Sequence, residues 1–187
     1  MLNNDNNKKY ALLAALMMIS LLAFVSCCKQ MQKENIEGSA HDIAFRIYSM
    51  AGKDAAFAPE ERISAENLYI LGISEQVFHN DVEEATALYS SELAMGNALC
   101  VIVAHNEEKA QKLYKDMCEE YDWAPCDPAE SIGLMLCGRY IVTAKDDRET
   151  TAKLCNAFSN MTHGEAFVKL YQNPMRALAP MVYDRKI

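Results

Sequence analysis

The feature that most constrains the fold is a run of seven residues, Ala98–Ala104 (ALCVIVA), without a charged or strongly polar side chain. A short apolar run of this kind is typical of a strand that is covered on both faces. Shortly after it, the segment from Glu107 to Tyr121 repeats apolar residues at i, i+3, i+4 and i+7, and Asn106 stands at the N-cap position. The sequence therefore predicts a central strand followed by an amphipathic helix.

Patterns before this pair predict two more elements. Ser39, with Asp42 three residues later, has the form of a capping box and predicts a helix that ends at Gly52. Apolar residues alternate with polar ones from Ala85 to Met95, which predicts a half-buried strand. Gly96-Asn97 suits a tight hairpin turn, so this strand should pair with the central one.

Patterns after the pair complete the predicted domain. Two short apolar runs, Leu134–Cys137 and Tyr140–Ala144, lie on either side of Gly138 and predict a second hairpin. Asp147 stands at the N-cap of a last helix, whose predicted buried residues are Thr151, Leu154, Cys155, Phe158 and Met161. The predicted order is α-β-β-α-β-β-α, an α+β fold in which helices pack on one face of a small antiparallel sheet. We place this domain at residues 39–163.

Residues 164–187 are predicted to be a C-terminal tail. Within it, Phe167, Val168 and Tyr171 have the spacing of a short helix. The composition, 51% hydrophobic and 24% charged, is that of a chain able to bury a core, which excludes wholesale disorder. The net charge of −8 argues against a nucleic-acid partner, because binding phosphates needs an excess of Lys and Arg.

The N-terminal residues have the pattern of an export signal. Lys8 and Lys9 precede 16 uncharged residues, from Ala11 to Ser26, and Cys27 and Cys28 follow directly. Phe24-Val25-Ser26-Cys27 resembles the bacterial lipobox, although Phe24 stands where Leu is usual. That resemblance implies that residues 1–26 are a signal peptide and that Cys27 is lipidated and becomes the first residue of the mature chain. An uncleaved signal anchor and a buried core helix are the alternatives.

The mature chain would be an acidic domain on a short tether. Residues 1–26 contain one Asp and two Lys, a net of +1, so their removal leaves a charge of −9. Residues 27–38 are then the lipidated Cys and a polar tether. An acidic domain is repelled by an acidic membrane surface, so we expect it to stand off the membrane rather than lie flat on it.

Four segments of the domain carry a resemblance to a known family. They are Leu68–Ile73, the Ala87–Ala104 hairpin, the helix from Glu107 to Tyr121, and Gly138–Val142. Together they resemble an uncharacterised bacterial lipoprotein family, the domain of unknown function 4358, over roughly residues 40 to 160. Leu71 separates a Tyr-Gly pair of that family, and Arg139 stands where Asn is common. The resemblance implies a lipoprotein of the cell envelope and implies no activity.

The chain has seven cysteines, and apart from the adjacent Cys27 and Cys28 they are far apart. Zinc ribbons and thioredoxin-like motifs need a CxxC spacing that these positions lack. Cys100, Cys118, Cys137 and Cys155 fall on apolar faces, where Cys acts as a small hydrophobic residue. The alternatives are a disulfide between Cys118 and Cys155, and a metal site made of Cys118, Cys126 and His105.

Sequence motifs of the common enzyme families are absent: there is no GxSxG, HExxH, Walker loop or GxGxxG. A Cys-His nucleophile pair would have to combine Cys126 or Cys100 with one of His79, His105 and His163. The adjacent carboxylates Glu83-Glu84 and Asp146-Asp147 are better explained by helix caps and solvated faces than by acid-base catalysis.

These observations favour a membrane-tethered bacterial lipoprotein whose domain lies outside the cytoplasm and binds without catalysis. Its partner would be another envelope protein, a peptide or a small solute, and we expect no metal and no cofactor. An envelope enzyme with an unrecognised active site is the alternative, and a structural spacer in an envelope complex is a third interpretation. A large exposed apolar patch would support partner binding.

Overall fold

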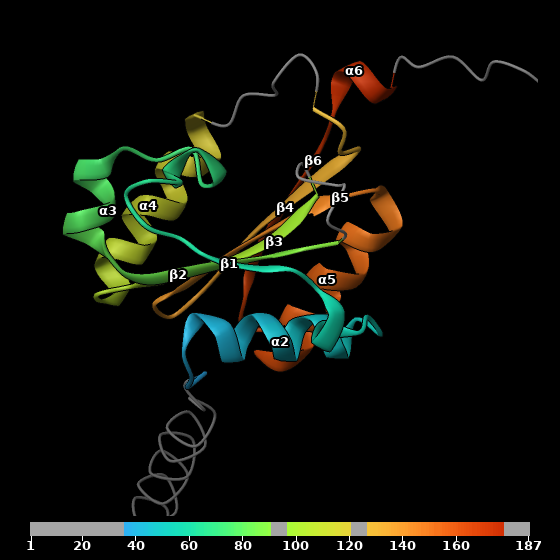
Figure 1. Ribbon diagram of the computed structural model, residues 1–187, viewed down its shortest axis with the longest axis horizontal. Helices are drawn as coiled ribbons and strands as arrows, with labels where there is room; N and C mark the ends of the chain where they lie inside the picture. Colours follow the sequence, from blue (N-terminus) through green and yellow to red (C-terminus); the bar gives the residue numbers. More distant parts are fainter. Residues whose placement is uncertain (1–35, 91–96, 121–126, 178–187) are drawn as a thin grey trace, which may run out of the picture. The chain divides into compact units, whose positions relative to one another are not determined.

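The computed structural model describes residues 36–90, 97–120 and 127–177 (Figure 1). The predicted signal peptide, Cys27, most of the tether, Gly96 and Cys126 lie outside these residues. Within them, no helix has the length and the apolar character needed to cross a bilayer.

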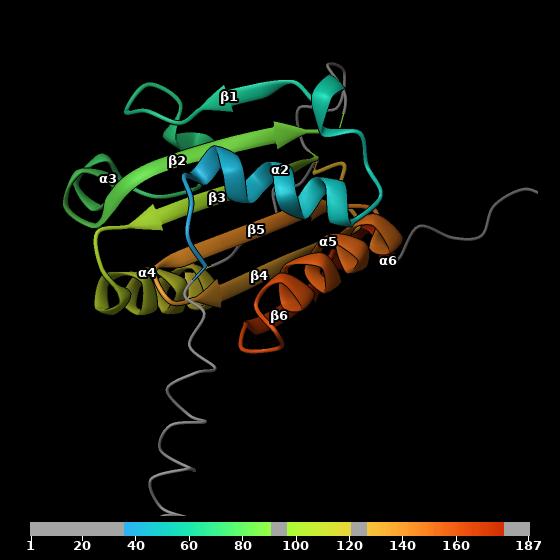
Figure 2. The ribbon, with the colours of Figure 1, turned by 90° about the horizontal axis from the view of Figure 1, so that it is seen from below.

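Six strands form one antiparallel sheet in the order β1-β2-β3-β5-β4-β6 (Figure 2). The predicted hairpin partners are paired: β2 with β3, and β4 with β5. The expected tight turn at Gly96-Asn97 is wrong, because Tyr89 rather than Met95 lies opposite Ala98, so the connection is longer than two residues. The strands are β1 (Glu60–Arg62), β2 (Val82–Tyr89), β3 (Ala98–Ala104), β4 (Ser131–Cys137), β5 (Tyr140–Asp146) and β6 (Phe167–Gln172).

Helices cover both faces of this sheet, as the edge-on view in Figure 1 shows. On one face lie α2 (Ala40–Met50) and α5 (Arg148–Met161), and on the other lie α3 (Glu75–Asp81) and α4 (Glu107–Glu120). The α+β class and the antiparallel sheet are confirmed. The expectation that the helices share one face is wrong, because the central strands β3, β5 and β4 are apolar on both sides and need a cover on each.

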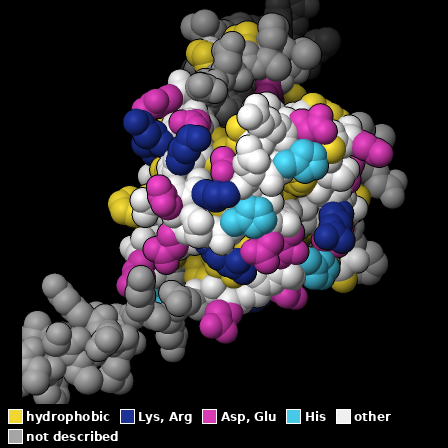
Figure 3. Space-filling model, turned by 90° about the vertical axis from the view of Figure 1, so that its left-hand side faces the viewer, with side chains coloured by type: hydrophobic (Ala, Val, Ile, Leu, Met, Phe, Trp, Pro, Cys, Tyr) yellow, Lys and Arg dark blue, Asp and Glu magenta, His cyan; other side chains and the backbone are white. Residues whose placement is uncertain are grey.

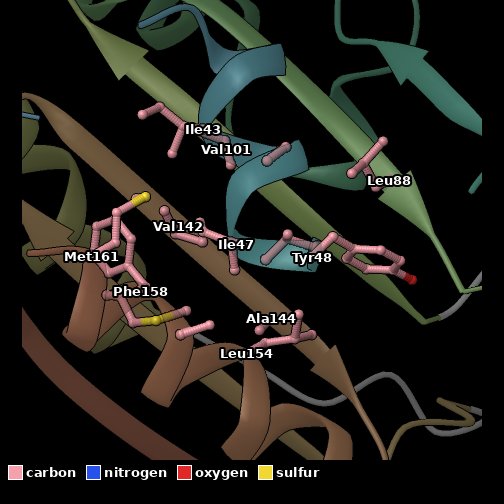
Figure 4. Packing of buried hydrophobic residues seen from close by; sticks show 14 of the residues in the cluster. Ile43, Ile47, Tyr48, Leu88, Val101, Val142, Ala144, Leu154, Phe158 and Met161 are labelled. Carbon is pink, nitrogen blue, oxygen red and sulfur yellow. The ribbon is translucent and has the colours of Figure 1, made fainter. Parts of the chain in front are cut away.

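Each face has its own hydrophobic core, and alternate residues of the same strand contribute to the two. Figure 4 shows the core under α2 and α5, where Ile47 and Phe158 pack against Val101 and Val142 of the sheet. On the opposite face, Leu113 and Tyr114 of α4 pack into a core with the side chains of Ile102, Leu134 and Ile141. The apolar run of β3 thus supplies both cores, as its sequence predicts.

The predicted helix ends are confirmed. At the start of α2, the Ser39 hydroxyl accepts from the Asp42 N–H at 3.1 Å, and the Asp42 carboxylate accepts from the Ser39 N–H at 3.1 Å. Gly52 follows the helix with a φ of +74°, and the bonds from Gly52 to Ser49 and from Lys53 to Tyr48 close the C-terminal turn.

The caps of the other two long helices are also as predicted. Asn106 Oδ1 accepts from the Lys109 N–H at the start of α4, and Asp147 Oδ1 accepts from the Thr150 N–H at the start of α5. All five predicted apolar-stripe residues of α5 are buried.

The structure contains elements that the sequence analysis does not predict, namely β1, α3, β6 and two short 3₁₀ helices. Phe167–Gln172 is a strand, so the predicted helix at Phe167, Val168 and Tyr171 is wrong. Pairing with β4 gives about half of the backbone N–H and C=O groups of this segment a hydrogen-bond partner. A short, exposed helix would be less stable, because its first turn is costly to form. A short helix, α6 (Pro174–Ala177), does lie further along this segment.

Candidate functional site

The described cysteines are all free and occupy both faces of the sheet. Cys155 lies in the core under α2 and α5, whereas Cys118 packs against the core under α4. The alternative disulfide between Cys118 and Cys155 is therefore wrong, because the sheet separates the two thiols. Burial raises the pKa of both Cys100 and Cys155 to about 11, so these thiols are protonated core side chains at neutral pH.

The histidines proposed for a Cys-His pair lie at the surface. His79, His105 and His163 are all exposed, and His79 contacts Glu75 one turn earlier on α3, with 3.4 Å between Nε2 and Oε1. Cys100 is instead buried in mid-strand, opposite Thr143 of β5. Among the residues that the structure describes, no three His, Cys, Asp or Glu side chains are grouped so that they could hold a metal ion. The hypotheses that involve Cys126 lie outside the described residues.

The adjacent carboxylates have structural roles. Asp147 caps α5, and the bonds that it accepts from Thr150 hold its pKa below the usual range. Glu83 forms an ion pair with Arg139 at 2.5 Å, and Glu84 Oε1 accepts from the Ala40 N–H in the first turn of α2 at 2.6 Å. The contacts of Asp147 and Glu83 agree with the cap and surface interpretation of the sequence. For Asp146 that interpretation is wrong, because its side chain is buried and accepts from the Asn97 amide at 3.0 Å.

A cluster of buried polar groups lies where β5 ends and β4 begins. Asp127, whose side chain is 3% exposed, forms an ion pair with Lys145 of β5. The buried Asn173, directly after β6, donates to the Ala129 carbonyl at 2.9 Å, and Arg176 donates to the Asp127 carbonyl at 3.3 Å. Each of these contacts joins a connecting segment to the end of a strand. We therefore interpret this cluster as stabilising the fold rather than as a binding site.

Four of the six large apolar side chains that are exposed among the described residues lie on β6 and α6. The strand β6 is the last strand of the sheet, so its outer side has no strand partner among the described residues. Phe167, Val168 and Leu170 are 69%, 39% and 54% exposed, and Met175 in α6 is 43% exposed. Exposed apolar residues that are adjacent along one edge are typical of an interaction site.

The opposite edge of the sheet is built differently. The strand β1 has three residues, all charged, and both of its Glu side chains contact neighbouring residues. Glu60 contacts His41 Nδ1 and accepts from the Thr86 hydroxyl, both at 2.8 Å, while Glu61 accepts from Asn67 and Tyr89 at 2.6 and 2.7 Å. A short, charged edge discourages the addition of another strand. The two edges therefore differ in kind.

Charge also sets β6 apart. From Ala166 to Ala177 the chain has no acidic residue but has Lys169 and Arg176, although the whole chain has a net charge of −8. The face at the α3 and α4 end of the molecule, by contrast, intermingles basic, acidic and His side chains (Figure 3). Ion pairs such as Lys109–Asp81, at 3.5 Å, account for part of that pattern.

No family model matches the chain, and neither a curated protein nor a solved structure matches it significantly. The resemblance to the domain of unknown function 4358 thus stays a prediction. The β6 edge was missed by sequence reasoning, although the run Phe167–Tyr171 alternates between aromatic or basic residues and aliphatic ones. That period of two was the signal that could have identified it.

Proposed function

We propose that this chain is a bacterial cell-envelope lipoprotein, anchored in the membrane through Cys27, whose domain is a non-catalytic interaction module. The anchor is supported by the order of basic, apolar and small residues before Cys27 in the sequence. Two or more acyl chains hold a protein firmly on a membrane, whereas one alone is marginal. The domain then acts at the membrane surface.

The anchor is tested by metabolic labelling with an alkyne fatty acid. The wild-type chain and Cys28→Ala should both incorporate the label, because both keep the Cys27 sulfur that we expect to be modified. Cys27→Ala should remain an unprocessed and unlabelled precursor. Full labelling of Cys27→Ala would show that the lipid is attached elsewhere, and an unlabelled wild-type chain would show that the chain is not a lipoprotein.

The observation that carries the interaction module is the exposed apolar edge at β6. Helices cover both faces of the sheet and β1 is charged, so the fold concentrates its accessible apolar groups at this strand. An extended segment of a partner protein can pair with the open backbone there and cover Phe167, Val168 and Leu170. This mode of binding obtains affinity from main-chain hydrogen bonds and specificity from alternate side chains.

Site-specific photo-crosslinking in intact cells tests this function. The amino acid p-benzoylphenylalanine replaces Phe167 or Leu170 on β6, or the equally exposed apolar residues Met50 and Tyr69 elsewhere, which are 52% and 74% exposed. We expect a discrete protein adduct from the β6 positions and none from the two control positions. Equal yields at all four positions, or no adduct from β6, would refute an interaction at this edge.

A further inference from the structure

The exposed groups of β6 indicate the kind of surface that covers it. A strand that pairs on one side only leaves half of its N–H and C=O groups pointing outward. A lipid surface would cover the apolar side chains but would leave these backbone groups unsatisfied, which hydrocarbon does not tolerate. A second strand satisfies the backbone and covers the side chains together. The edge therefore fits a strand and does not fit a membrane.

We infer that this strand is β6 of a second copy of the chain, paired antiparallel about a two-fold axis at Leu170. The inference rests on the proposed function, in which β6 accepts a partner strand. Closed two-fold dimers are the commonest assemblies of identical chains, because one surface then serves both partners. Lipid-anchored copies are also confined to one membrane, which raises the rate at which two of them meet.

Symmetry and charge together select the register. In a continuous sheet the two-fold axis is perpendicular to the sheet, so one residue must lie opposite itself. The axes that pair most of the six residues pass through Lys169 or Leu170. An axis at Lys169 would place two ammonium groups directly opposite each other, which is destabilising. An axis at Leu170 places an exposed aliphatic side chain against its own copy.

The Leu170 register also makes favourable pairs on both faces. Leu170 and Val168 are on the face of α2 and α5, because they pair with Gly133 and Met135 of β4. On the α4 face, Lys169 of each copy lies opposite Tyr171 of the other. Tyr171 donates from its hydroxyl to the Cys118 carbonyl at 3.1 Å, which holds the ring in place. An ammonium group placed over a tyrosine ring is attractive.

This arrangement has a distinctive dependence on salt. The two Lys169 side chains are diagonal neighbours about 7–8 Å apart, and both chains are acidic overall, so the copies repel each other at long range. Salt screens this repulsion, so self-association should be unchanged or stronger as salt rises. An acidic strand from a different protein would be attracted by Lys169 and Arg176 and would bind more weakly in salt.

The first test identifies the partner in cells. The full chain with p-benzoylphenylalanine at position 170 is expressed together with a second, differently tagged copy, and the adduct is probed for both tags. We expect one adduct, with twice the mass of the chain, that carries both tags. An adduct with another protein would overturn the second-copy inference and leave the interaction module intact. The lack of any adduct would overturn both.

The second test measures self-association of the full chain in detergent by sedimentation at several salt concentrations. Leu170→Lys places two like charges opposite each other and should weaken the dimer at least about tenfold. Tyr69→Lys adds the same charge at an exposed residue far along the chain from β6 and should leave the dimer unchanged. Lys169→Gln removes the diagonal repulsion but leaves both chains acidic, so association of this variant should still not weaken as salt rises.

Circular dichroism of each variant confirms that the fold is kept, which is expected because Tyr69, Lys169 and Leu170 are all exposed. A monomer at all concentrations, or a dimer that Leu170→Lys leaves intact, would refute pairing at this axis. Association that weakens as salt rises would also refute it.

Discussion

The helix α5 approaches the sheet closely at Gly133, and this contact gives a sharp test of the packing. Gly133 lies in β4 between β5 and β6, on the face that α5 covers. A Cβ atom built there would overlap Cys155 Sγ of α5, well inside the 3.0 Å that real Cβ atoms observe. Leu170 and Thr151 would be at ordinary contact distances of 3.5 and 3.6 Å. The conflict is therefore with one sulfur atom.

From this geometry we expect Gly133→Ala to be destabilising in the wild-type chain and stabilising in Cys155→Ala. Overpacking of a core costs about 1–3 kcal/mol in the free energy of unfolding. Replacing Gly by Ala within a strand returns roughly 0.5–1 kcal/mol, because the unfolded chain loses freedom. The wild-type background should show a net loss of about 1–2 kcal/mol.

In the Cys155→Ala background the new methyl group fills the space that the sulfur left. Cys155→Ala alone should cost about 1 kcal/mol for the lost contacts and the small cavity. Adding Gly133→Ala should then recover about 0.5–1 kcal/mol, so the sign of the effect reverses. The coupling between the two changes should be about 2 kcal/mol, well above the 0.3–0.5 kcal/mol within which independent sites add.

Urea unfolding followed by circular dichroism, under reducing conditions, measures all four proteins of this cycle. The control is Cys100→Ala, which removes a buried thiol on the opposite face of the sheet. Gly133→Ala should cost the same there as in the wild-type chain. An equal cost of Gly133→Ala with and without the Cys155 sulfur would refute the reasoning, because the close approach would then not set the stability.

Two further outcomes follow from the described residues. At pH 8, Cys100 and Cys155 of the folded chain should react with a maleimide at least about a hundred times more slowly than in denaturant. Burial raises the pKa of both thiols to about 11 and blocks access of the reagent. Rapid labelling of the folded chain would contradict their positions in the core. Asp147→Ala should destabilise the chain by about 1 kcal/mol at pH 7, because α5 loses its N-cap. The Asp147 pKa is lowered in the folded chain, so its contribution is present above the unfolded pKa and lost as pH falls through the folded one. The difference between wild type and Asp147→Ala should therefore shrink in acid; a difference that is constant down to pH 2 would argue against a charged cap.

The features that sequence predicts correctly are those with local causes. The capping box at Ser39, the caps at Asn106 and Asp147, and the turn at Gly138 are each determined by residues within a few positions. The apolar run of β3 correctly predicts a strand covered on both faces. The same evidence already contradicted helices on one face only, because a strand that is buried on both sides needs two covers.

The features that sequence does not predict depend on distant partners. The segment from Phe167 to Tyr171 fits a short helix by its apolar spacing and a strand by its alternation. What decides between them is the side of β4 that β5 leaves free, and β4 begins 36 residues before Phe167. The exposure of the β6 side chains could not be predicted from the sequence for a related reason. Apolar periodicity indicates which residues can be buried, but it does not show that Phe167 and Leu170 remain at an edge.

The single charge in β6, on Lys169, also affects whether the exposed apolar edge adds one strand or continues to add strands. An open, apolar edge strand is a hazard because each added chain offers a new edge to the next. Pairing about Leu170 uses the β6 edges of both copies, and the edges that remain are the two β1 strands, which are short and charged. Lys169 opposes the pairing centred on itself and so favours one register over its neighbour. The chemistry of the two edges thus favours a closed pair over a growing fibre.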